Sequence, residues 1–119
     1  MRPFARTQRL NDEIQRILAD LIEREVQDPR VGFATVTGVR AAKDLSTARV
    51  FITVRSGQNV EETLAGLSAA AGFLRSRLAE QLQLRNVPEL HFRYDESVER
   101  GFRMDELFRR LAEEREEDA

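Results

Sequence analysis

The side chains that most often perform catalysis are few and scattered in this sequence. His91 is the single histidine, and no serine partner lies near it along the chain. It alternates with the apolar residues of an expected strand, so we interpret it as a solvent-facing imidazole rather than a catalytic base. Cysteine is absent, which excludes disulfides, thiolate zinc sites and thiol nucleophiles together.

The carboxylates also fail to form a recognisable site. Asp28, Asp44, Asp95 and Glu96 fall in expected turns, where aspartate commonly bonds its own backbone. No two of them stand out as an acid and base couple. His91 and Asp95 give only two ligands across a strand end, too few to indicate a metal. We therefore expect no catalytic residue, no metal site, no cofactor and no enzymatic activity.

Glycine spacing excludes the common phosphate-binding loops. The six glycines, at positions 32, 38, 57, 66, 72 and 101, are never closer than six positions apart. This rules out Gly-x-Gly-x-x-Gly, the P-loop and Gly-x-x-Gly alike.

Basic residues are the best remaining candidates for function. The formal net charge is only −2, but residues 112–119 carry −4, so residues 1–111 carry +2. Segments 1–11 and 28–60 each carry +3, and 18 of the 19 basic residues are arginine. Arginine suits bidentate phosphate recognition, which indicates a nucleic-acid partner, although high-GC codon usage explains the preference equally well.

A break in an expected helix offers a place for phosphate. The apolar stripe is interrupted at Ala70–Gly72, and a helix that starts there would expose free N–H groups and a positive dipole end. In the alternative interpretation, Gly72 only permits close helix packing and the arginines that follow form a solvated face. Those arginines are Arg75, Arg77 and Arg85.

Hydrophobic periodicity predicts the elements that position these residues. We expect a helix over 7–26 capped by Thr7, and a strand over 33–41 with a bulge at Gly38. A second strand is expected over 48–55, then a helix capped by Asn59 with Glu62 three residues later. That helical stripe reaches Leu82 as one kinked helix or two abutting helices. The remaining expectations are a third strand over 90–94, an irregular segment over 95–101 and a last helix capped by Asp105.

This order predicts an α+β fold: helix, strand, strand, helix, kink, helix, strand, helix. The long connection between the second and third strands permits a crossover, giving a mixed three-stranded sheet with helices on one face. Residues 1–111 are expected to form the single domain, and residues 112–119 an acidic, disordered tail. No long apolar run indicates a membrane span, and no apolar segment after Met1 indicates a signal peptide.

An ordered set of short segments resembles the ribosome-binding factor A (RbfA) family. Each segment is modest alone, but the set is collinear from about Arg6 to Leu111 and specific as a whole. The segments span residues 28–32, 36–39, 43–45, 48–51, 70–75, 84–92 and 94–95.

The resemblance implies a type II KH-like domain and a cytoplasmic bacterial factor that binds the small (30S) ribosomal subunit. Its implied role is late maturation of 16S rRNA by RNA binding without catalysis, as a monomer, with a part in cold adaptation. Ribosomal proteins are further implied partners, and a membrane is not. In this family an Ala-x-Gly kink replaces Gly-x-x-Gly, and Ala70-Ala71-Gly72 fits that pattern.

From the resemblance, we expect rRNA contacts along the kink and the basic surface. The chain has almost no lysine and a short acidic end, which argues against RNA binding by its tail. The expected contacts are Ala70, Gly72, Arg75, Arg77 and Arg85, with Arg6, Arg9 and Arg30 as secondary members.

Two other functions remain in view. A protein-interaction module could present the apolar stripe of the first or the last helix to a partner, including a ribosomal protein. A small-ligand enzyme would need a constellation of catalytic residues, which the sequence does not offer.

Overall fold

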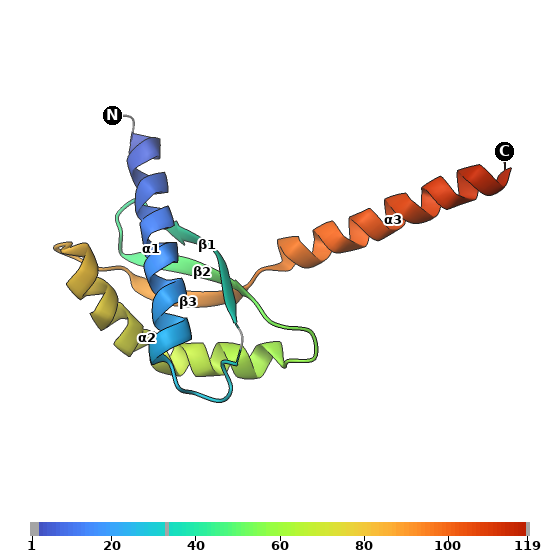
Figure 1. Cartoon of the computed structure of the whole chain (residues 1–119). Helices are drawn as coiled ribbons and strands as arrows, with labels where there is room; N and C mark the ends of the chain where they lie inside the picture. Colours follow the sequence, from blue (N-terminus) through green and yellow to red (C-terminus); the bar gives the residue numbers. More distant parts are fainter. Residues whose placement is uncertain (1–2, 33, 119) are drawn as a thin grey trace.

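The chain forms three helices and three strands in the computed structural model, which describes residues 3–32 and 34–118 (Figure 1). Their order confirms the α+β arrangement expected from the sequence. The elements are α1 (Pro3–Glu25), β1 (Thr35–Ala41), β2 (Thr47–Thr53), α2 (Val60–Leu82), β3 (Glu89–Tyr94) and α3 (Glu96–Asp118).

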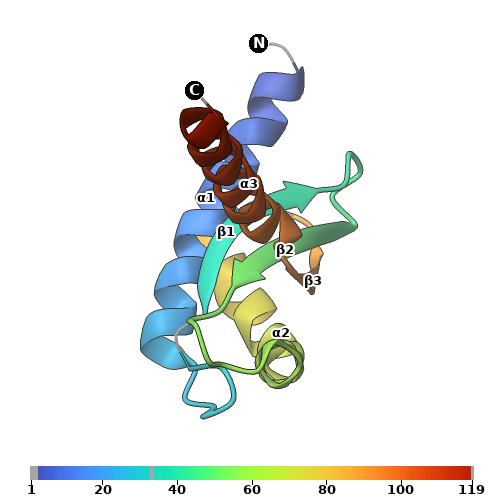
Figure 2. The same cartoon turned by 90° about the vertical axis from the view of Figure 1, so that its right-hand side faces the viewer.

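The strands form one mixed sheet in the order β1-β2-β3. β1 and β2 are an antiparallel hairpin, whereas β2 and β3 are parallel because α2 crosses over between them. α1 and α2 cover one face of this sheet, and α3 runs away from the body (Figure 2). The other face of the sheet, called the open face below, is therefore left without a covering helix.

β1 contains the expected bulge. Its pairing with β2 skips one residue, Thr37, between Val36 and Gly38. Side chains alternate along a strand, so Val36 and Val39 would normally point to opposite faces. The extra residue shifts the alternation, and both valines are buried. Without it, one of them would lie on the open face.

One continuous core lies between the helices and the sheet. Fully burying a side chain of this size contributes about 1.5–3 kcal/mol, so these residues are the main source of stability. The buried amide of Asn11 on α1 also fixes the end of β1, since its Oδ1 accepts a hydrogen bond from the Ala41 N–H at 2.9 Å. The core's large residues include Ile14, Leu18, Val50, Ile52, Leu67, Leu74, Leu78, Leu90 and Phe92.

Two helix starts differ from the sequence-based expectation. α1 begins at Pro3 rather than at Thr7, because proline has no N–H to leave unpaired and its fixed φ suits a first helical turn. α3 begins at Glu96 rather than at Asp105, so the expected irregular segment 95–101 is wrong. The Asp95 carboxylate supplies the start, since it accepts a hydrogen bond from the Ser97 N–H at 3.0 Å. Phe33, expected in the first strand, lies outside the described residues.

α2 is one helix with a bend near its middle (Figure 1), so the kinked-helix alternative is the correct one. The expected cap is present: Asn59 Oδ1 accepts from the Glu62 N–H at 3.0 Å. Gln83 ends the helix in the left-handed region, with a φ of 52°.

No element ends at residue 111, where we expected the domain to finish. Residues 112–118 form the last turns of α3, and the division of the chain at 111 stays a prediction.

Alanine substitutions at two glycines of α2 should change the stability of the protein in opposite directions. A Cβ at Gly66 would lie 2.9 Å from Val31 Cγ2 and 3.3 Å from Arg30 Cβ, whereas a Cβ at Gly72 would meet no atom within 4 Å. Gly66→Ala should lower the free energy of unfolding by about 1 kcal/mol, because crowding outweighs the gain in helix propensity. Gly72→Ala should raise it by about 0.5–1 kcal/mol. Urea unfolding followed by circular dichroism measures both, and equal shifts would contradict the packing described here.

Candidate nucleic-acid interface

A shallow groove lies beside the bend of α2, between this helix and the segment that leads to β3. The exposed Gly72 is part of its wall, together with Arg75, Ser76, Arg85 and Asn86. Because a Cβ at Gly72 would meet nothing within 4 Å, this glycine is not needed for packing inside the chain. The alternative that Gly72 serves close helix packing is therefore wrong within this chain. We call these five residues the α2 groove.

The bend does not create a free helix start. α2 is continuous from Val60 to Leu82, so its backbone N–H groups at the bend belong to the helix's own hydrogen bonds. The expected anion site at a helix N-terminus is thus absent there. Any phosphate at the α2 groove would have to be held by side chains.

Ala70 lies apart from the α2 groove. It is half-buried, packs against the core and lines a different hollow, together with Gly66, Phe73 and Val26, the residue directly after α1. The structure therefore separates Ala70 from Gly72, although both belong to the Ala-x-Gly segment.

Arg75 has a structural role. Its Nε and Nη2 donate hydrogen bonds to the Val87 carbonyl at 3.1 and 2.7 Å, which tie α2 to the segment that enters β3. The neighbouring Val87 side chain is buried. One edge of the guanidinium is thus occupied by the protein itself, while the residue as a whole remains exposed.

Arg77 points to a different side of α2 from Arg75, because two positions along a helix are about 200° apart. Its guanidinium lies 3.4 Å from Glu25 at the end of α1 and 3.4 Å from Glu80. It also lies over the Phe73 ring, 5.5 Å from the centroid. Two carboxylates thus offset its charge.

Arg85 is the least engaged of the three. It is exposed, lines the α2 groove and makes no hydrogen bond or ion pair with any residue that the structure describes. Its guanidinium is therefore available to a phosphate from outside the chain.

The three secondary candidates also fall into two groups. Arg6 and Arg9 are exposed on the first turns of α1 and pair with no described residue. Arg30 is held by Asp28, with its Nη2 2.7 Å from Asp28 Oδ2. Hydrogen bonds from Arg30 hold the pKa of Asp28 below its usual value, and the same contact raises the pKa of Arg30. Arg30 is therefore neutralised locally.

Sequence reasoning missed a second group of cations, on the open face of the sheet. Arg40, Arg49 and Arg93 are exposed and come from three different strands. The alternation of β2 already placed Arg49 on the same side as Phe51. Arg40 could be added only once the bulge at Thr37 was located, because the bulge decides which face Arg40 takes.

The described part of the chain offers no metal centre and no membrane span. No three His, Asp or Glu side chains within residues 3–32 and 34–118 are close enough together to hold an ion. No helix in those ranges is long and apolar enough to cross a bilayer. His91 lies half-exposed on β3, with its Nε2 3.7 Å from a Glu89 carboxylate oxygen.

Known proteins share both the sequence and this fold. Ribosome-binding factor A of Pseudomonas putida (strain F1) is 50% identical over 116 residues, which cover 94% of this chain and 88% of the relative. The Pseudomonas fluorescens (strain Pf-5) protein of the same name is 49% identical over 114 residues, covering 93% and 86%.

Two solved structures agree with these relatives. The crystal structure of ribosome-binding factor A from Thermus thermophilus is 32% identical, with a TM-score of 0.68, and covers 74% of this chain and 93% of its own. A homology model of the T. thermophilus factor, fitted into a cryo-EM map of a 30S–RbfA complex, is 31% identical with a TM-score of 0.63, covering 76% and 96%. The family model of ribosome-binding factor A matches residues 6–108. This chain belongs to the ribosome-binding factor A family.

Proposed function

We propose that this protein binds the small ribosomal subunit in the cytoplasm and assists late maturation of 16S rRNA by RNA recognition, without catalysis. The observation that carries the proposal is the likeness to the T. thermophilus factor fitted into a 30S complex, whose chain is matched over 96% of its length. The arginine-lined α2 groove supports it, since such a surface suits phosphate.

Within this function, we assign the direct rRNA contacts first to Gly72 and Arg85. Gly72 lets another molecule approach the helix backbone, and the guanidinium of Arg85 pairs with no described residue. Arg75 positions the wall of the groove and can offer its remaining N–H groups. Arg6 and Arg9 extend the basic surface along α1. Ala70, Arg77 and Arg30 contribute less, because they pack inside the chain or face carboxylates.

A protein contact is a second candidate, and α3 is the observation that favours it. This helix leaves the body of the protein (Figure 1). It exposes large apolar side chains at helical spacing. A ribosomal protein could cover such a stripe while the α2 groove holds rRNA. The exposed residues are Met104, Leu107, Phe108 and Leu111.

The full chain should co-sediment with isolated small subunits and not with large subunits. Binding carried by phosphate contacts releases counterions, so the logarithm of the association constant should fall linearly with the logarithm of salt concentration, by about 0.7–0.9 per phosphate neutralised. Sedimentation across a salt series measures the slope. Co-migration that ignores salt, or that survives nuclease digestion of the rRNA, would favour the α3 contact instead.

Arg85→Gln and Arg75→Gln should separate binding from folding. Arg85→Gln should weaken small-subunit binding several-fold and leave the unfolding midpoint unchanged, because no described residue depends on this side chain. Arg75→Gln should lower the free energy of unfolding by about 1–2 kcal/mol, since the Val87 carbonyl loses charge-assisted hydrogen bonds. Sedimentation and urea unfolding on both variants give the comparison. Full binding by a folded Arg85→Gln protein would move the rRNA site away from the α2 groove.

Gly72→Ala should weaken binding while it stabilises the fold. The added methyl has free space in the isolated protein, so a loss of affinity would report a close approach of RNA to the helix at this point. Gln81→Ala is the control, because Gln81 is exposed on the same helix and lies nine positions, or about 180° around the helix, from Gly72. Fluorescence-detected titration of both variants with small subunits measures the difference. Equal affinities would show that nothing approaches Gly72.

A further inference from the structure

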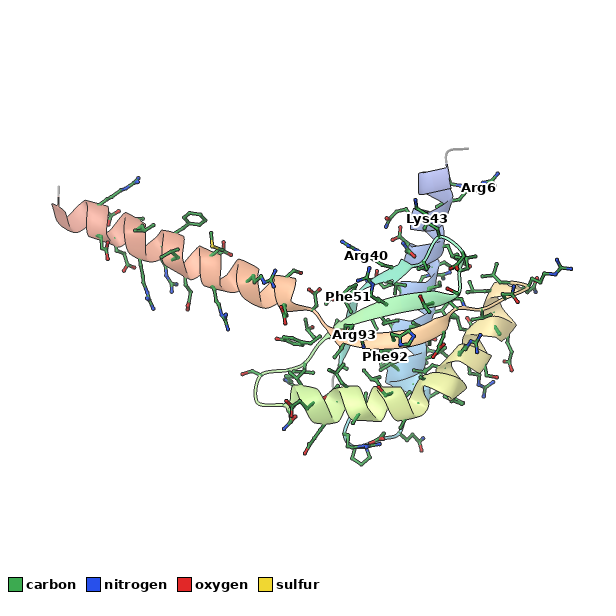
Figure 3. All side chains as sticks on the ribbon, turned by 180° about the vertical axis from the view of Figure 1, so that it is seen from behind. Arg6, Arg40, Lys43, Phe51, Phe92 and Arg93 are labelled. Atoms are coloured by element: carbon green, nitrogen blue, oxygen red, sulfur yellow. The ribbon has the colours of Figure 1, made fainter. Side chains whose placement is uncertain are left out.

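The open face of the sheet carries two arginines in direct register, with a histidine in the same row. Arg40 on β1 pairs with Arg49 on β2, and Arg49 pairs with His91 on β3. Paired positions across neighbouring strands bring Cβ atoms to about 4.5–5.5 Å from each other. Figure 3 looks onto this face with α1 behind the sheet, and Lys43 lies at the hairpin end beside Arg40.

The arginines of this row form no ion pair with any described residue. Arg40, Arg49 and Lys43 are exposed and make no hydrogen bond or ion pair with any residue that the structure describes. Asp95 and Glu96 line the same hollow as Arg40, but no ion pair joins Arg40 to a described residue. Glu89 lies beside His91, at 3.7 Å. Like charges directly opposite each other destabilise a sheet. The Arg40–Arg49 pair therefore has a repulsion that a bound anion would lower.

An aromatic residue occupies the neighbouring row. The half-buried Phe51 on β2 pairs with Gly38 on β1 and with Arg93 on β3. Gly38 has no side chain, so this cross-strand neighbour adds no cover to the Phe51 ring. Gly38, Phe51 and Arg40 also line one hollow of the surface. Figure 3 shows Arg40, Phe51 and Arg93 following one another across the three strands.

Cations beside a partly exposed ring on a sheet match the chemistry of single-stranded RNA. The phosphates of an unpaired strand meet arginine, and its bases stack on an aromatic face, which a duplex does not offer. An acidic protein segment would meet the charges, but only an aromatic residue within it would stack on Phe51, whereas every base of an RNA offers a planar face. We propose that the open face, through Arg40, Arg49 and Phe51, binds an unpaired RNA segment separate from the α2 groove.

The inference rests on the proposed function only for the choice of RNA as the anion. The α2 groove lies along a helix that packs on the opposite side of the sheet. The two surfaces can therefore be tested separately.

An indole in place of the Phe51 ring reports stacking directly. The chain contains no tryptophan, so Phe51→Trp gives a single emitting indole. A mixed-sequence single-stranded RNA of about ten nucleotides should quench this emission, because bases stack on the ring. The same sequence as a duplex, or a polyglutamate peptide, should leave the emission unchanged. Phe108→Trp, at an exposed position on α3, is the control and should show no quenching.

The arginines are tested with the native Phe51 in place. Arg40→Gln/Arg49→Gln should raise the dissociation constant for the labelled single strand by about ten-fold at low salt. It should also reduce the salt slope by about 1.4, which corresponds to two phosphates on a single strand. Arg109→Gln/Arg110→Gln on α3 removes the same charge and should change neither quantity much. These measurements by fluorescence anisotropy also decide the matter if Phe51→Trp does not fold.

The outcomes separate this inference from the proposed function. Quenching of the Phe51→Trp variant by single-stranded RNA, with the loss of affinity in the arginine variant, supports the open-face site. The site is overturned if RNA does not quench the Phe51→Trp emission and the arginine variant binds the labelled strand as tightly as the native protein. The proposed function stays intact in that case if the full chain still co-sediments with small subunits. Quenching by polyglutamate and not by RNA overturns it in favour of a protein occupant.

Discussion

One extra residue in β1 decides what each face of this protein presents. Thr37 is the unpaired member of a bulge, and its hydroxyl donates a hydrogen bond to the Asp95 carboxylate where β3 passes into α3. Because of this bulge, Val36 and Val39 both reach the core, and Arg40 falls in register with Arg49 on the open face. A regular strand would have to expose a valine to place Arg40 there. Core packing and surface charge are thus set together by a single backbone irregularity.

The sequence was sufficient for the order of the elements, because each element carries its own periodic signal. The alternation over residues 48–55, the Asn59 cap and the glycine at position 38 are local features. The structure has a strand and a capped helix at the first two, and a bulge at Thr37, one residue before Gly38. The starts of α1 and α3 were missed because they depend on single contacts. Pro3 suits the first turn of a helix, and the Asp95 carboxylate accepts a hydrogen bond from the Ser97 N–H. Neither feature appears in the hydrophobic periodicity of the sequence.

The roles of the arginines could not be read in the same way. Arg75, Arg77 and Arg85 are close in sequence, and composition treats them as one basic cluster. In the fold, Arg75 bonds a backbone carbonyl, Arg77 faces two carboxylates, and Arg85 is left available. These differences come from β3 and α1, which are distant in the sequence. Local charge in the sequence therefore gave too much weight to Arg75 and Arg77 as RNA-binding candidates. It gave too little weight to the arginines of the sheet, which come together only through strand pairing.

Cations that pair with no described residue lie on more than one side of the molecule. Arg85 faces out beside α2, whereas Arg40 and Arg49 lie on the open face of the sheet, which α1 and α2 do not cover. With both proposed sites, one part of an RNA would meet the α2 groove and an unpaired part would meet the sheet. The sheet itself separates the two surfaces, and its buried residues resist deformation because close-packed cores do. A protein built this way would hold two RNA segments at a fixed separation, so its effect on the RNA would be geometric and would need no catalytic residue.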